Sequence, residues 1–350
     1  MNNREKVKQI CGVTEFAYFD RKNPTEINCL PYYKNYAEEM IMFYNKQSIS
    51  VYKNREFIFD YSSRFNINGK AHIDKEIDLV FISEGSLYKI YSAFSRLVID
   101  GAFSEFTYIK EIVNIQIKQQ YEDVIEYQYD YSLPIDYNGK LISEYMSMFA
   151  VKFIILHELA HHINGHLLYI QEYYGQDHFQ NNQLPKNLIK TLEMDADAFA
   201  ISQLVLDFKE IVQNDIELNN LLIPNEIKLG LLIFSLTTLL IMLEEENIKT
   251  SNKYMSGKMR RVHNLSCLET NLKIRYPDFF DGINYDSVAA YYLDKSERYY
   301  KLVYDYSDKI VDSIYQIKEE YKSFHDIKNM WNDIHNELSK FARASLSPKY

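Results

Sequence analysis

The sequence predicts an α+β fold that is predominantly α-helical. Two kinds of pattern lead to this prediction. In the first third, short segments rich in aromatic and β-branched residues alternate with turn-like residues, as expected of a small β-sheet. From Leu141 onward, apolar residues recur at helical spacing. We therefore divide the chain into a mixed α/β part, residues 1–135, and a helical part, residues 136–350, and expect the two to pack as one unit.

Three segments of the first part have the composition of β-strands. Glu56–Tyr61 and Ile77–Ser83 are apolar and are separated by the turn-like residues NINGK. Tyr127–Leu133 alternates aromatic and polar residues before Pro134, which is the pattern of a half-buried strand. Between these segments, Ser86–Leu97 has the periodicity of a helix. We expect the strands to form a small N-terminal sheet.

Two stretches of the second part predict further helices. Val288–Ala342 contains no Gly or Pro and alternates apolar and charged residues at helical spacing, which predicts two or three long amphipathic helices that serve as a scaffold. Leu229–Leu243 is an uninterrupted apolar run between Lys228 and Glu244. It is shorter than the roughly 20 residues of a membrane-spanning helix. We interpret it as a helix buried in a protein core.

Charge, the N-terminal residues and cysteine usage limit partners and location. A formal net charge of -10 disfavours nucleic acid, which needs clustered Lys and Arg. The first residues, MNNREKVKQICGVTEF, contain no apolar run of signal-peptide length. The three scattered cysteines, Cys11, Cys29 and Cys267, fit reduced thiols better than disulfides. We expect a cytoplasmic protein that binds neither nucleic acid nor membrane; its oligomeric state is not predicted.

The run HELAHHINGH contains the spacing HExxH within Ile142–Tyr169, which we interpret as one mostly buried helix. Residues four apart share a helix face, so His157 and His161 present two imidazoles to one point. Glu158 lies one step round the helix, near enough to act on a water molecule at that point. We predict that His157 and His161 bind Zn²⁺ and that Glu158 is the general base.

Neither of the other two histidines of this run supplies a third ligand on this interpretation. His162 and His166 fall off the face that carries the motif, so we interpret them as surface groups or as groups that support the ligands. The extended pattern HExxHxxGxxH is also absent, because Asn164 and Leu167 stand at its Gly and last His positions. The third ligand must therefore come from elsewhere in the chain.

A second helical pattern, Thr191–Leu206, provides that ligand. Glu193 and Asp197 are four residues apart and share a face, and small alanines beside them allow this helix to approach the first closely. We predict that Glu193 is the third zinc ligand. Asp197 is expected to accept a hydrogen bond from the non-ligating nitrogen of a zinc-binding histidine. Asp195 lies on the other side of the helix, so we expect its substitution to have little effect.

Hydrolysis of a peptide bond at this site also needs a hydrogen-bond donor for the tetrahedral oxyanion, typically His, Tyr or Arg. We name His263 as the candidate oxyanion donor, with Arg260, Arg261 and the many tyrosines as alternatives. Peptide substrates can bind such sites as an added strand along a sheet edge. The strand-like run before the HExxH helix is the edge that we expect to serve here.

The residues HELAHHINGH followed by EMDADAFA resemble the gluzincin group of HExxH metallopeptidases, whose motif is HExxH with a later ExxxD. The resemblance covers Lys152–Leu204. Within the group, the arrangement is similar to the Lit-type phage-exclusion peptidases. The second choice is the ImmA/IrrE-type regulatory peptidases, which commonly carry Asn where this chain has Asp197. The resemblance implies a zincin-like core, a zinc cofactor and proteolytic activity in the cytosol.

Two classes of function follow. The first is a zinc-dependent endopeptidase that hydrolyses a peptide bond in a specific intracellular protein, with a role in phage exclusion on the Lit-like resemblance or in stress regulation on the ImmA/IrrE-like one. The second is a non-catalytic, zinc-containing interaction or regulatory protein. Structural zinc sites are usually closed, four-ligand and rich in Cys, and no Cys lies near this motif in the sequence. The presence of Glu158 therefore favours the enzyme.

Overall fold

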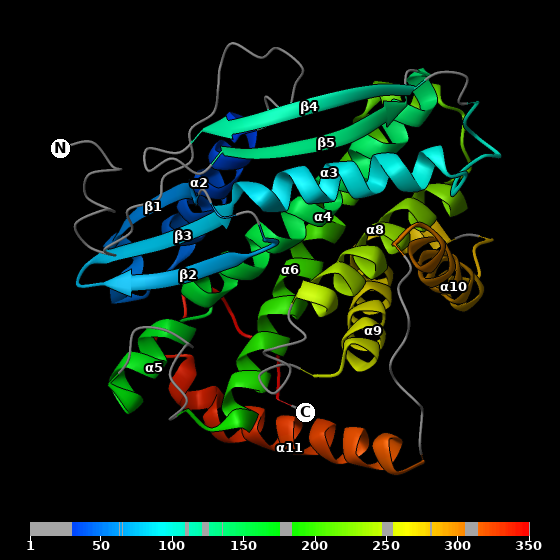
Figure 1. Ribbon diagram of the computed structural model, residues 1–350. Coiled ribbons are helices and arrows are strands. Elements are labelled where there is room, and N and C mark those ends of the chain that lie inside the picture. Colours follow the sequence, from blue (N-terminus) through cyan, green and yellow to red (C-terminus); the bar gives the residue numbers. More distant parts are fainter. Residues whose placement is uncertain are drawn as a thin grey trace.

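A long central helix, α4 (Tyr137–Ile163), runs through the computed structural model, and most other elements pack around it (Figure 1). The structure describes residues 30–349 except positions 63, 65, 109–111, 121–125, 135, 176–183, 247–254, 281 and 305–313. Cys11, Cys29 and the N-terminal segment on which the predicted location rests lie outside the described residues. The fold is α+β and predominantly helical, as the sequence predicts.

A three-stranded sheet lies against one end of α4, with the order β1-β3-β2. The predicted strands β1 (Glu56–Ser62) and β3 (Ile77–Ser83) are both present and run parallel to each other. The sequence did not predict β2 (Gly69–Asp74), which begins within the turn-like residues NINGK and pairs antiparallel with β3. Among the described strands none pairs with the outer edge of β2, so β2 is an edge strand.

A separate two-stranded hairpin lies along helix α3 (Glu84–Ile99), which was expected over Ser86–Leu97 (Figure 1). The predicted strand Tyr127–Leu133 corresponds to β5 (Glu126–Pro134), and its antiparallel partner β4 (Ile112–Gln120) was not predicted. The described residues therefore form two small sheets where the sequence suggested one.

The other regular elements of the described chain are helices. In the described part of Val288–Ala342 the structure shows two long helices, α10 (Tyr285–Tyr304) and α11 (Ile314–Leu338), within the predicted number of two or three. Helix α6 (Lys186–Asn214) packs against α4, and α9 (Gly257–Arg275) and α11 both pack against α6 (Figure 1). Helix α8 (Asn225–Glu246) lies between α4 and α10. The remaining helices of the described residues are α2 (Leu30–Gln47), α5 (His166–Tyr174) and α7 (Ile216–Asn220), with short 3₁₀ turns at Val51–Asn54 and Pro277–Phe280.

The helix predicted over Ile142–Tyr169 is broken into two. Helix α4 ends at Ile163, with Asn164 as its C-cap, and α5 starts two residues later. Gly165 between them has a φ of 77°, which favours glycine. A Cβ atom at this position would also lie 2.6 Å from the backbone carbonyl carbon of Phe341. The turn is therefore fixed both by its backbone conformation and by contact with the C-terminal segment.

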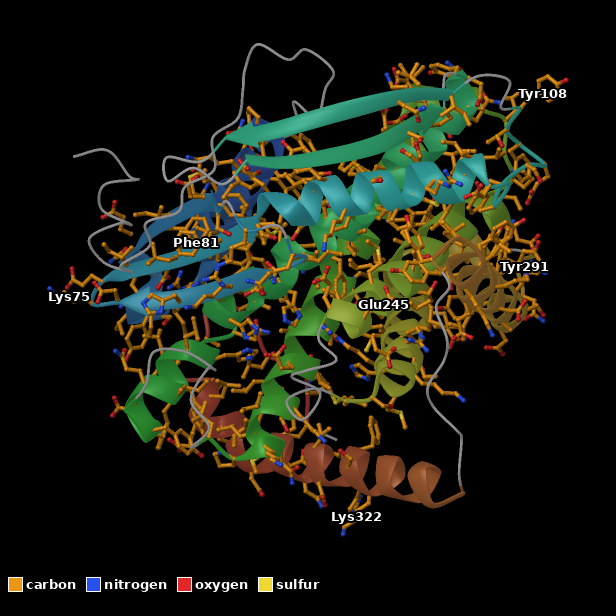
Figure 2. All side chains as sticks on the ribbon, viewed as in Figure 1. Lys75, Phe81, Tyr108, Glu245, Tyr291 and Lys322 are labelled. Atoms are coloured by element: carbon orange, nitrogen blue, oxygen red, sulfur yellow. The ribbon has the colours of Figure 1, made fainter. Side chains whose placement is uncertain are left out.

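The apolar run Leu229–Leu243 lies within α8 and is buried, as predicted. Helix α8 has 22 residues, so by length and composition alone it could cross a membrane, contrary to the expectation that it is too short. However, 83% of its most apolar window is covered by the rest of the protein. Gly230 brings α8 close to α10, because a Cβ atom there would lie 2.1 Å from the ring of Tyr292. Side chains from surrounding helices fill this region (Figure 2).

A buried ion network joins the sheet, the end of α4 and the C-terminal segment. Asp78 of β3 is fully buried, pairs with Arg343 and accepts from Arg55 Nε at 2.6 Å. His162 of α4 lies beside it, with Nδ1 3.5 Å from Asp78 Oδ1, and its Nε2 donates to the carbonyl of Leu79 at 3.0 Å. Burial alone would raise the pKa of Asp78, but His162 and the two guanidinium groups outweigh it and hold the pKa well below its usual value.

Removal of the Arg343 side chain is expected to destabilise the fold strongly. The Arg343→Ala variant leaves Asp78 buried with one partner fewer, and breaking a buried ion pair costs about 3–5 kcal/mol. Arg96→Ala is the control, because Arg96 pairs with Asp100 at the surface, where such pairs contribute about 0–1 kcal/mol. The free energies of unfolding from urea titrations decide the matter. Similar losses in the two variants would contradict a stabilising role for the buried network.

Candidate metal centre

The structure brings the three predicted zinc ligands together. His157 and His161 project from the end of α4, and Glu193 faces them from α6. One ligand atom of each residue lies within 4.8 Å of those of the other two, and all three side chains are buried. The Nε2 atom of His157 is 3.1 Å from Glu193 Oε2, and the Nε2 atom of His161 is 3.9 Å from Glu193 Oε1. Both histidines thus turn the same ring nitrogen toward one carboxylate.

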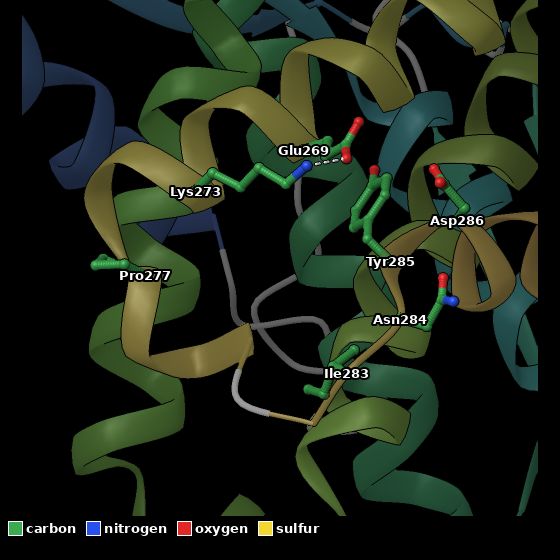
Figure 3. A pocket seen from close by; sticks show the side chains of 7 residues that line it. All are labelled: Glu269, Lys273, Pro277, Ile283, Asn284, Tyr285 and Asp286. Carbon is green, nitrogen blue, oxygen red and sulfur yellow. Dashed lines mark hydrogen bonds and ion pairs between the residues drawn. The ribbon is translucent and has the colours of Figure 1, made fainter.

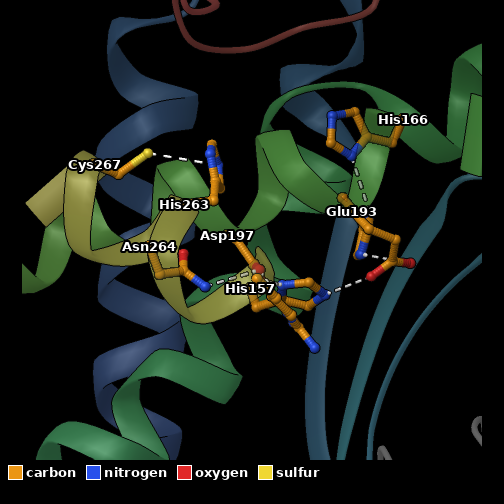
Figure 4. Close-up of polar contacts among 9 residues, drawn as sticks. His157, His166, Glu193, Asp197, His263, Asn264 and Cys267 are labelled. Carbon is orange, nitrogen blue, oxygen red and sulfur yellow. Dashed lines mark hydrogen bonds and ion pairs between the residues drawn. The ribbon is translucent and has the colours of Figure 1, made fainter. Parts of the chain in front are cut away.

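Asp197 holds the other side of the His157 ring, as predicted. His157 Nδ1 donates to Asp197 Oδ1 at 2.8 Å, because an ionised carboxylate can only accept (Figure 4). When the ring is neutral, as in a metal ligand, its lone pair is on Nε2, the nitrogen that faces Glu193. Asp197 also accepts from Arg260 Nε at 2.6 Å, from Arg260 Nη2 at 2.7 Å and from Asn264 Nδ2 at 3.1 Å. Helix α9 thus fixes the orientation of the carboxylate.

The electrostatics of the cluster favour a positive charge between the carboxylates. Burial lowers the pKa of His157, but hydrogen bonds with Asp197 and Glu193 outweigh this and raise it to about 10. For Asp197, burial favours the neutral acid, yet Arg260 and His157 hold its pKa well below the usual value. Burial and the neighbouring His157 lower the pKa of His161, so that its ring is neutral. A proton or a divalent metal can supply the positive charge.

Glu158 lies between this cluster and the edge strand β2. Its carboxylate packs directly over Gly69, where an added Cβ atom would lie 2.7 Å from Glu158 Cγ. Burial raises the pKa of Glu158 to about 7, and the negative charge of Glu193 adds to this effect. The charge on His157 and a hydrogen bond from the backbone N–H of Ala71 act in the opposite direction. A carboxylate with a pKa near neutrality can both accept and return a proton.

His263, the candidate oxyanion donor, belongs to α9 and lines a cavity that is separate from the cluster. Its ring is 3.5 Å from the Sγ atom of Cys267 and bonds to the backbone of Met194 (Figure 4). Burial lowers the pKa of His263, so the ring is neutral. Cys267 forms no disulfide within the described part of the chain. These contacts lead away from the zinc-ligand candidates, and the role of His263 as an oxyanion donor stays a prediction.

Among the cavities outside the cluster, two are formed in part by α9. The first, of about 730 Å³, is lined among others by Asn164, Asp195 and His263 and by residues of the C-terminal segment. The second, of about 330 Å³, lies between α9 and the start of α10, where Lys273 bonds to Glu269 (Figure 3). Neither cavity is lined by His157, His161 or Glu193.

Sequence reasoning missed several residues that support the site. Arg260 was considered only as an oxyanion donor, whereas it makes two hydrogen bonds to Asp197. Asn264 was not singled out, although it lies four residues after Arg260 and therefore on the same helix face. Burial excludes the interpretation of His166 as a surface group and leaves its role as a group that supports the ligands, and Asp195 was not assigned to the site. Both are buried, and His166 bonds to both His161 and Asp195.

The donor set fits a zinc ion. Two neutral imidazole nitrogens and one carboxylate, with a fourth position open to water, are the ligands of catalytic zinc sites. The observed cluster supplies these three donors from two packed helices, and it carries a hydrogen-bonded carboxylate behind one histidine, as zinc sites usually do. A buried His-His-Glu group of this kind can bind a metal ion.

The comparison with known protein families agrees with this chemistry. The sequence model of the Peptidase U49 family matches residues 100–272, just under half of the chain, and the match includes every candidate site residue from His157 to His263. The match supports a peptidase, that is, a hydrolase, and together with the buried cluster it fits a metallopeptidase. No curated protein and no solved structure matches the chain.

Substitutions of Glu193 and Asp197 should distinguish a metal ligand from a residue that orients a ligand. Glu193→Ala removes a donor atom from the cluster and is expected to abolish stoichiometric zinc binding. Asp197→Ala leaves all three donors but frees the His157 ring, so zinc affinity should fall about 10–100-fold. Asp207→Ala is the control on the same helix, because Asp207 pairs with Lys152 instead. Zinc titration against a chelator measures the zinc affinity of all three variants. Wild-type affinity in Glu193→Ala would remove this residue from the ligand set.

Proposed function

We propose that this protein is a zinc-dependent endopeptidase that hydrolyses a peptide bond in a specific intracellular protein. The observation that carries the proposal is the buried cluster of His157, His161 and Glu193 with Glu158 beside it. The match to the Peptidase U49 family supports the class of reaction independently of the geometry. Zinc is proposed as the metal because two imidazoles and one carboxylate are a common catalytic zinc ligand set.

The residues of the chain divide the chemistry between them. His157, His161 and Glu193 would hold the metal, which when bound polarises the scissile carbonyl and makes water a better nucleophile. Glu158 takes a proton from the attacking water and returns it to the leaving amine, and its pKa of about 7 suits both steps. His263 remains the proposed oxyanion donor, on the evidence of the sequence alone. Arg260, which bonds to Asp197, is the alternative.

The edge strand β2 is the place where an extended substrate would bind. The sequence pointed to the run before the HExxH helix, but that run is β5, which pairs with β4 and lies along α3. The strand that contacts Glu158 is β2, at Gly69 and Ala71. A peptide added to the outer edge of β2 would place its backbone beside Glu158, with main-chain hydrogen bonds giving affinity.

The biological role is proposed from the resemblance to Lit-type peptidases. On this proposal the protein acts in the cytoplasm, its partner is a protein substrate, and cleavage of that substrate serves phage exclusion. An infection assay comparing cells that express the wild-type protein and the Glu158→Gln variant tests it. Protection that requires Glu158 supports the role. Equal phage yields in both strains, at equal protein levels, would contradict it.

Glu158→Gln is expected to retain the fold and zinc while losing hydrolysis, because the amide cannot accept the proton of the attacking water. The change keeps the volume of the side chain beside Gly69. Profiling of new protein N-termini in cells that express each form detects cleavage of any cellular protein, so the substrate need not be known beforehand. Cleavage products common to both forms, with zinc bound in both, would favour the non-catalytic alternative.

Gly69→Ala tests the position of Glu158 against β2. A Cβ atom at this position would lie 2.7 Å from Glu158 Oε1, the end of a flexible side chain, so the carboxylate should move while the fold adapts. We expect near wild-type zinc affinity with cleavage reduced at least about 10-fold, since misplacement of about 1 Å can cost 10²-fold in rate. The control is Ala71→Gly, which adds no atoms beside Glu158. Wild-type cleavage by Gly69→Ala would show that β2 does not fix the general base.

A further inference from the structure

A chain of hydrogen bonds runs from His161 away from the metal cluster. His161 Nδ1 is 3.0 Å from His166 Nδ1, and His166 Nε2 is 2.9 Å from Asp195 Oδ2. Asn164 Nδ2 then donates to the same Asp195 oxygen at 2.6 Å. All four side chains are buried, and the imidazoles of His161 and His166 meet edge to face. The chain joins α4, the turn after it, α5 and α6.

The direction of each hydrogen bond follows from the carboxylate at the end of the chain. Asp195 can only accept, so His166 carries its proton on Nε2. In the neutral His166 ring, Nδ1 is then the acceptor, and the contact with His161 requires His161 to donate from Nδ1. The neutral His161 ring keeps its lone pair on Nε2. That is the nitrogen that faces Glu193, as a metal ligand must.

The fold explains how His166 reaches His161. In an uninterrupted helix a residue five positions on lies about 140° round the axis and faces away. The left-handed Gly165 ends α4 and starts α5, and this turn brings His166 back onto the ring of His161. Asp195 approaches from α6, on the opposite side from Asp197.

We propose that His166 and Asp195, with Asn164 behind them, are positioning residues that fix the tautomer and orientation of His161 for metal binding. The inference rests on the proposed role of His157, His161 and Glu193 as zinc ligands. His157 bonds directly to the carboxylate of Asp197. His161 instead bonds to His166, and His166 bonds to the carboxylate of Asp195. Helix α6 would then supply one ligand and both carboxylates that orient the histidines. Asp195→Ala, which the sequence alone suggests is nearly silent, should therefore weaken zinc binding.

The test measures zinc affinity by chelator competition and thermal unfolding of the zinc-free protein in the same variants. His166→Ala and Asp195→Ala should each lower zinc affinity about 10–100-fold, the usual effect of losing support behind a ligand. The double variant should be no weaker than the weaker single variant, because both changes break the same chain. Asp195→Asn retains an acceptor oxygen for His166, so it should recover most of the affinity that Asp195→Ala loses.

Gln203→Ala is the matched control for zinc affinity, because it removes another buried polar side chain of α6 that lies outside this hydrogen-bond chain. It should leave zinc affinity unchanged. A purely structural role would lower the unfolding temperature of the zinc-free His166 and Asp195 variants without changing their zinc affinity, and that result would overturn the inference. Failure of the proposed ligand set is distinct: there, His161→Ala or Glu193→Ala would itself bind zinc as the wild type does, and both proposals would fall.

Discussion

From Phe149 to Ile163 every residue of helix α4 except Glu158 is buried, and this constraint shapes the rest of the site. A polar side chain in such a position costs free energy unless it is paired or ligated. The last two turns carry three buried histidines, and each of them has a polar partner. His157 and His161 share Glu193, and His162 donates to the carbonyl of Leu79 beside the Asp78 ion network. One helix thus combines the candidate metal site with an anchor to the sheet.

Helix α6 supplies the carboxylates that pair with the buried histidines of α4. Its segment EMDAD carries three buried acids, and none of them is left without a partner. Glu193 faces both candidate ligand histidines, while Asp197 is held by His157 and Arg260, and Asp195 by His166 and Asn164. A helix with acids on both sides could not be buried against α4 without these donors. The acids and the histidines therefore account for each other's burial.

The sequence was informative where a single helix carries the geometry. The spacings of His157 and His161, and of Glu193 and Asp197, place each pair on one face, and the structure brings these residues together. Strand β2 and the role of Arg260 depend on tertiary contacts between distant segments, so no local pattern could predict them. The break after α4 is different, because Asn-Gly is a local turn signal that the long apolar run obscured.

That break links the C-terminal segment to the metal site. Gly165 has no room for a Cβ atom because Phe341 packs against it, and the backbone N–H of Arg343 donates to the carbonyl of Ile163 at 2.6 Å. Arg343 also pairs with Asp78 in the network that includes His162. The residues that close the fold at its C-terminal end therefore hold the turn that directs His166 onto His161. On this structure, overall stability and the orientation of His161, a candidate metal ligand, depend on the same contacts.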